Sequence, residues 1–118
     1  MSTKNLYIER IEHELTAAQE AQRVGNDGKA RVCCRRAAGQ ALTWWCTKYP
    51  RPHWKPDALS QLIFLKDEQL FSEDVRNAAH RLTVKISGNF EYSISANPIE
   101  DARTIIGAVT AMMSDDAD

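Results

Sequence analysis

The feature that most constrains the fold is the spacing of apolar residues in the stretch KARVCCRRAAGQALTWW, residues 29–45. Apolar side chains recur there every three or four positions, as one buried face of an α-helix requires. The face is rich in alanine and Gly39 lies beside it, so we expect another helix to approach closely. The residues of this face are Ala30, Cys34, Ala37, Ala38, Ala41, Leu42 and Trp45.

Residues 3–24 show the same helical periodicity, and the sequence Gly-Asn-Asp-Gly at 25–28 then predicts a short turn between two antiparallel helices. The stretch PRPHWKP at 50–56 holds three of the four prolines, so it predicts an ordered loop. A short third helix is expected after it. The apolar positions expected on these two helices are Tyr7, Ile11, Leu15, Ala18 and Val24 on the first, and Leu59, Leu62, Ile63 and Leu65 on the third.

Two helix starts are marked by capping residues. Ser72 precedes Glu73 and Asp74, which complement the positive end of a helix. Asn97 precedes Pro98 and Glu100, the residue types favoured at the first and third helical positions. The fourth helix would bury Val75, Ala78, Ala79, Leu82 and Ile86, and the fifth would run to about Met113.

These segments predict an all-α protein, an antiparallel up-and-down bundle of about five helices that occupies residues 1–118 as one domain. Short disordered ends are expected at 1–3 and 114–118. Between the last two helices, Phe90, Tyr92 and Ile94 alternate with polar residues, which allows a short extended segment.

Composition excludes several classes of protein. A net charge of −1 argues against a globally basic nucleic-acid binder. Three cysteines, two of them adjacent at Cys33 and Cys34, favour reduced and mostly buried thiols. The sequence shows no phosphate-binding glycine loop, metal-ligand cluster or long apolar run. We therefore expect a cytoplasmic protein without cofactor, metal site or membrane span.

The tryptophans are expected to differ in exposure. Trp45 falls on the apolar face of the second helix and Trp54 in the proline-rich loop, where it can fold against the bundle. Trp44 falls outside that face. It is thus the one tryptophan that the sequence predicts to be exposed.

The last predicted helix has apolar residues around more than one face. A single chain has limited room to bury all of them, so we expect a homodimer. The residues concerned are Ile99, Ala102, Ile105, Ile106, Val109, Met112 and Met113.

Basic residues gather near the start of the second helix, at Lys29, Arg31, Arg35 and Arg36. Arg31 and Arg35 are four positions apart and share a face, so they can hold a phosphate or a nucleic acid together with Arg36. The alternative is a solvated face paired with acidic residues of the first helix. The candidate partners there are Glu9, Glu12, Glu14 and Glu20.

The octet VRNAAHRL at 75–82 places Arg76, Asn77 and His80 on one helix. Together with the earlier stretch GKARVCCRRAAGQAL, it resembles the HEPN superfamily over residues 6–110. The resemblance implies a dimeric helical bundle, often a metal-independent ribonuclease of a toxin–antitoxin pair with an Arg-x4–6-His motif. Other members bind a partner, frequently a nucleotidyltransferase. Arg76 would be the catalytic arginine of the family, Asn77 its polar follower and His80 its histidine.

The spacing in this chain is Arg-x3-His, one residue shorter than the family motif. At about 100° per residue, Arg76 and His80 lie roughly 40° apart on one face, whereas residues five apart differ by roughly 140°. We therefore expect a non-catalytic binding module that engages RNA, a nucleotide or a partner protein. A ribonuclease and a purely structural interaction module are the alternatives. An exposed and adjacent pair of Arg76 and His80 at a dimer cleft would favour the ribonuclease, and a buried or salt-bridged Arg76 the module.

Overall fold

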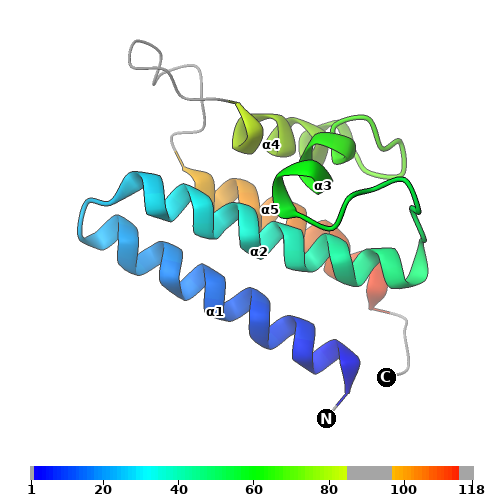
Figure 1. Ribbon diagram of the computed structural model, residues 1–118, viewed down its shortest axis with the longest axis horizontal. Helices are drawn as coiled ribbons and strands as arrows, with labels where there is room; N and C mark the ends of the chain where they lie inside the picture. The colour runs from blue at the N-terminus through cyan, green and yellow to red at the C-terminus, as the bar shows by residue number, and fades with distance from the viewer. Residues whose placement is uncertain (1, 85–96, 115–118) are drawn as a thin grey trace.

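The computed structural model describes residues 2–84 and 97–114, and within them every regular element is an α-helix. The predicted all-α class is confirmed, with an up-and-down order of the long helices (Figure 1). The expected extended segment at 87–96 and Ile86 lie outside the described residues. The helices are α1 (Thr3–Arg23), α2 (Asp27–Lys48), α3 (Ala58–Leu65), α4 (Glu73–Thr83) and α5 (Pro98–Met113).

Each helix begins at a side chain that caps its first turn. The predicted caps are confirmed: the Ser72 hydroxyl accepts from the Val75 amide at 3.4 Å, and the Asn97 side chain accepts from the Glu100 amide at 3.1 Å. Ser2 does the same for α1, so that helix begins at Thr3, within the end that the sequence assigned to disorder. The remaining caps are Asn26 and Asp57.

Helix α2 is the centre of the bundle and contacts each of the other four described helices. Helix α1 runs antiparallel to it after a turn at Gly25, whose φ of 81° lies in the left-handed region that glycine tolerates. Figure 1 shows α3 and α4 on the opposite side of α2 from α1, with α5 behind α2. Helix α4 packs against α5. The C-terminus of α4 lies near the start of α2, where Arg31 and Arg35 donate to its carbonyl oxygens.

The core follows the predicted face of α2, because all seven of its apolar residues are buried. Gly39 lets α3 approach α2: a Cβ there would lie 2.6 Å from the Cβ of Ala58, closer than packed atoms allow. The expected close approach of another helix is confirmed. The proline-rich loop is ordered, and Trp54 stacks on Phe64 with 5.9 Å between ring centroids.

Several predicted exposures are wrong. Trp44 is 3% exposed, because its ring stacks on Tyr7 of α1. Val24 is 60% exposed, since it follows the last residue of α1. On α3, Leu59 and Ile63 are each 44% exposed, because this short helix rests on α2 by the side that holds Ala58, Gln61, Leu62 and Leu65.

Helix α5 does not leave an apolar face open. Its contacts with α2 and α4, and a smaller one with α1, enclose it on several sides. The apolar surplus that suggested a dimer is thus accommodated within one chain. Ala102, Ile105, Val109 and Met113 are buried, and Ile99, Ile106 and Met112 are partly buried against the same core.

Membrane insertion finds no support in the described helices. None of those in residues 2–84 and 97–114 combines the length and the apolar character that a span needs.

Candidate functional site

Arg31 and Arg35, predicted to bind phosphate, instead bind the C-terminus of α4. Arg31 Nη2 donates to the carbonyl oxygens of Arg81 and of Val84, the latter at 3.1 Å, and Arg35 Nε donates to the carbonyl of Leu82 at 2.6 Å. The last carbonyls of a helix have no partner within it and carry its negative partial charge. The predicted outward orientation of Arg31 is wrong: it is 5% exposed and faces α4, not the glutamates of α1.

Asp101 completes this region from α5. Its carboxylate, 6% exposed, accepts from Arg81 Nη2 at 2.8 Å and from Arg81 Nε at 3.2 Å. The hydrogen bond to Asp101 raises the pKa of the Arg81 guanidinium. We call Arg31, Arg35, Arg81 and Asp101 the arginine junction, because these residues tie α2, α4 and α5 together at one end of the bundle.

Burial governs the electrostatics of the arginine junction. It lowers the pKa of Arg31, which the charge of Arg35 lowers further and the charge of Asp101 raises, and burial also lowers the pKa of Arg35. The neighbouring Cys34 thiol has its pKa raised to about 12, mainly by burial. Such a thiol is unreactive at neutral pH. The junction therefore links α4 to α2 and α5 through partly buried charged groups.

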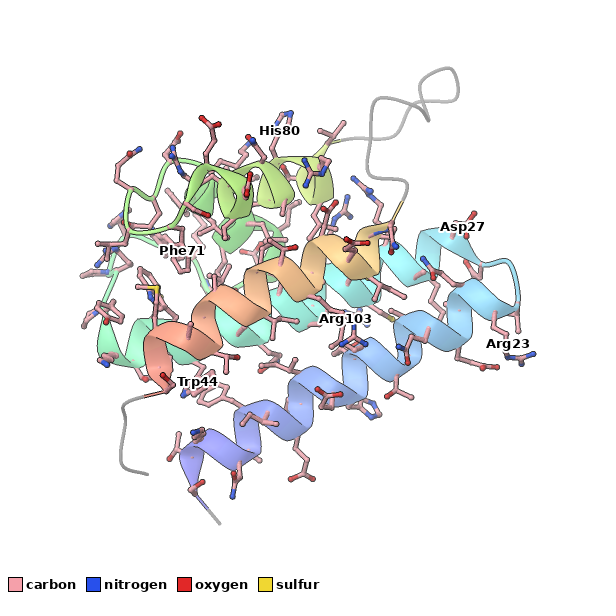
Figure 2. All side chains as sticks on the ribbon, turned by 180° about the vertical axis from the view of Figure 1, so that it is seen from behind. Arg23, Asp27, Trp44, Phe71, His80 and Arg103 are labelled. Carbon is pink, nitrogen blue, oxygen red and sulfur yellow. The ribbon has the colours of Figure 1, made fainter. Side chains whose placement is uncertain are left out.

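The predicted catalytic residues occupy the outer face of α4. Arg76 is half-buried, and its Nε donates to the carbonyl of Phe71 at 3.2 Å. Asn77 and His80 are exposed, and Figure 2 shows His80 directed away from the bundle. Arg76 is thus held by the chain just before its own helix, and it is neither fully buried nor salt-bridged to a described residue. The histidine stands apart from any described hollow.

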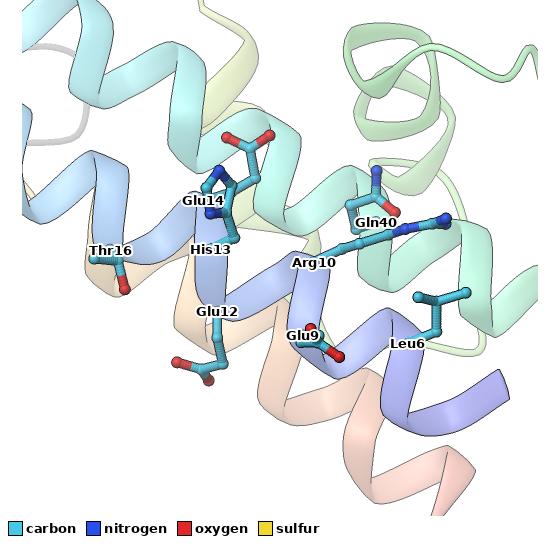
Figure 3. Close-up of a pocket in the computed structure, with 8 residues that line it drawn as sticks. All are labelled: Leu6, Glu9, Arg10, Glu12, His13, Glu14, Thr16 and Gln40. Atoms are coloured by element: carbon cyan, nitrogen blue, oxygen red, sulfur yellow. The ribbon is translucent and has the colours of Figure 1, made fainter. Parts of the chain in front are cut away.

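Two hollows among the described residues lie elsewhere, along α1. The larger, about 650 Å³, is shown in Figure 3 and is formed almost wholly by side chains of α1 around Arg10 and His13, with Gln40 from α2. The smaller, about 260 Å³, lies where α1, α2 and α3 meet, and it includes Arg36. Arg36 is the one predicted phosphate ligand that is exposed. Within the described residues, no three His, Cys, Asp or Glu side chains gather to hold a metal ion.

Sequence reasoning missed Asp101 and Gln61 as buried polar residues of these regions. Asp101 was readable as an acidic residue in the first turn of α5, and Arg81 as a basic residue in the last turn of α4. Asp101 complements the positive end of α5 and Arg81 the negative end of α4. Each residue was thus explained within its own helix, and the pattern provided no reason to expect an ion pair between them. Gln61 interrupts the otherwise apolar α3 and is buried, which is the signal that it has a polar role.

Compared with known proteins, the chain matches no family model, no curated protein and no solved structure.

Proposed function

We propose that this protein is a non-catalytic helical interaction module of the HEPN-like kind, which acts as a homodimer. The observation that carries the proposal is the apolar flank of α3. Leu59 and Ile63 lie one helical turn apart and are each 44% exposed, and Leu70, just beyond α3, is 53% exposed. Exposed aliphatic side chains that share one flank of a helix, as Leu59 and Ile63 do, are typical of a surface that another protein covers.

The state of the arginines supports binding of a protein in preference to a phosphate. Arg31 donates to carbonyls of α4 through Nη2, Arg35 does so through Nε, and Arg76 donates to the carbonyl of Phe71 through Nε. A phosphate at Arg31 Nη2 or at Arg35 Nε would have to displace hydrogen bonds that close the end of a helix. RNA and nucleotide binding are therefore less well supported than a protein partner. The nucleotidyltransferase implied by the family resemblance is one such partner.

A metal-independent ribonuclease is the second candidate. Arg76 and His80 lie one turn apart on α4, and His80 is exposed, so an RNA strand can reach it. A phosphate would meet the guanidinium of Arg76 only by competing with the carbonyl of Phe71.

Sedimentation equilibrium at micromolar concentration tests the main proposal. The wild-type protein should give about twice the monomer mass, and Ile63→Lys should give the monomer, because a charged side chain on the flank cannot be buried without a partner. Val24→Lys is the matched control, since Val24 is even more exposed but lies at the end of α1, and it should remain dimeric. A wild-type monomer would overturn the homodimer, and a dimeric Ile63→Lys would overturn the role of α3.

A further inference from the structure

The hollow of about 260 Å³ between α1, α2 and α3 is lined by polar side chains, and not all of their hydrogen-bonding groups have partners within the described residues. Glu14 comes from α1, Arg36 and Gln40 from α2, and Gln61 from α3. Two of these, Glu14 and Gln40, also line the larger hollow, and Figure 3 shows Glu14 directed from α1 toward α2, which carries Gln40. At about 30 Å³ for each water of the liquid, this space suits several waters or a ligand of amino-acid size.

The deepest polar group of the hollow is the side-chain amide of Gln61, which is 4% exposed. Its Nε2 donates to Thr43 Oγ1 at 2.9 Å, while its Oε1 has no hydrogen-bond partner among the described residues. A buried acceptor without a donor is unfavourable. Oε1 therefore favours any ligand that brings a donor to this point.

The lack of a side chain at Gly39 keeps the space beside this acceptor open. A Cβ at Gly39 would lie 3.2 Å from Gln61 Oε1 and would fill that space. The same glycine holds α3 tightly against α2, which fixes the position of Gln61 relative to the other lining residues.

The rim of the hollow carries opposite charges that do not neutralise each other. Arg36 is exposed and Glu14 is half-buried, and neither forms an ion pair or a hydrogen bond with another described residue. Both groups are therefore available to a ligand. A ligand with one charge of each sign would complement the two at once.

We propose that this hollow binds a small zwitterionic amino carboxylate, such as a free amino acid. Its carboxylate accepts from the guanidinium of Arg36. Its ammonium group donates to the carboxylate of Glu14 and to Gln61 Oε1. The lining of the hollow does not include Leu59 or Ile63 of the apolar flank of α3. Ligand binding and self-association can therefore be tested separately.

Two-dimensional ¹H–¹⁵N spectra of the full chain test the proposal, because the side-chain NH2 of Gln61 gives its own signals. The probes are the free L-amino acids, each compared with its N-acetylated acid and with the amine that lacks its carboxylate. We expect at least one free amino acid to shift the signals of Gln61 and Gly39 saturably. Both of its modified forms should bind about tenfold more weakly or worse, the loss expected for one charge-assisted hydrogen bond.

Variants locate the binding. Arg36→Gln and Glu14→Gln should each weaken binding of that amino acid by about tenfold or more. Arg103→Gln, which removes an exposed arginine of α5 (labelled in Figure 2), should bind it as the wild type does. If all three variants lost the same amount of affinity, the effect would not be specific to the residues of the hollow. That result would overturn the proposed site.

Two further results would also overturn the proposal. One is that inorganic phosphate or the N-acetylated acids shift the Gln61 signals as strongly as the free amino acids, which would make this a simple anion site. The other is that no free amino acid moves these signals at millimolar concentration. In either case the mass measured by sedimentation equilibrium still decides the proposed self-association.

Discussion

The arginine junction and the outer face of α4 both involve α4 and both contain arginines, but their guanidinium groups have different surroundings. In the junction, Arg31 is 5% exposed and donates to two carbonyls of the last turn of α4. On the outer face, Arg76 is half-buried and makes a single bond of 3.2 Å, and His80 is exposed. An arginine that closes a helix end from a buried position contributes to stability, whereas a half-buried arginine with a single hydrogen bond contributes less.

Removing Arg31 should have the largest effect on stability. Arg31→Met keeps the approximate length of the side chain but leaves the partly buried carbonyls of Arg81 and Val84 without these donors. We expect a loss of about 2–4 kcal/mol in the free energy of unfolding, measured by urea titration. Arg36→Met is the control, since Arg36 is exposed and should change the stability by less than about 0.5 kcal/mol. Equal effects of the two substitutions would remove the distinction between the regions.

Alkaline pH should lower the free energy of unfolding through deprotonation of Cys34, which neighbours the arginine junction. Burial raises the pKa of this thiol to about 12, against about 8.5 in an unfolded chain. Below the unfolded value both states keep the proton and the stability is complete. As the pH rises from there toward the folded value, only the unfolded state loses its proton, so the free energy of unfolding falls by about 1.4 kcal/mol per pH unit.

Urea titrations between about pH 8 and about pH 10 measure this dependence. Cys34→Ala should give a flatter profile than the wild type above the pKa of an unfolded cysteine, whatever its absolute stability. Parallel profiles would show that the thiol does not stay protonated inside the fold.

The pair Arg81–Asp101 should contribute less, because the Arg81 side chain is 43% exposed. Solvent screens an ion pair of this kind, although the bidentate geometry favours it, so we expect a coupling of about 1 kcal/mol. A double-mutant cycle with Arg81→Gln and Asp101→Asn measures that coupling. Independent effects of the two substitutions would mean that the pair does not hold α4 to α5.

The sequence predicts the helices of this fold well because their determinants are local. The caps at Ser72 and Asn97 act within one turn, and the apolar face of α2 is visible as a periodicity. The exposures of Trp44 and Ile63 were predicted wrongly for a common reason. Both depend on which neighbouring helix covers that side, and periodicity along one helix does not contain this information.

The site residues were harder to predict for the same physical reason. A run of arginines looks the same whether it faces water or the end of another helix. Arg31 and Arg35 acquire their partners only because α4 ends beside the start of α2, about fifty residues away in the chain. Gln61 likewise lies among apolar residues, and its unpaired oxygen exists only in the packed structure.

The outer face of α4 should be the least sensitive region, and its test bears most directly on the proposal that the protein binds and does not catalyse. Purified wild-type protein is incubated with single-stranded and structured RNA in EDTA, beside His80→Ala and a mock preparation. The account predicts no cleavage above the mock and a change in stability below about 0.5 kcal/mol for His80→Ala. Metal-independent cleavage by the wild type that His80→Ala reduces by about 10²–10⁴-fold, as loss of a general base does, would contradict it.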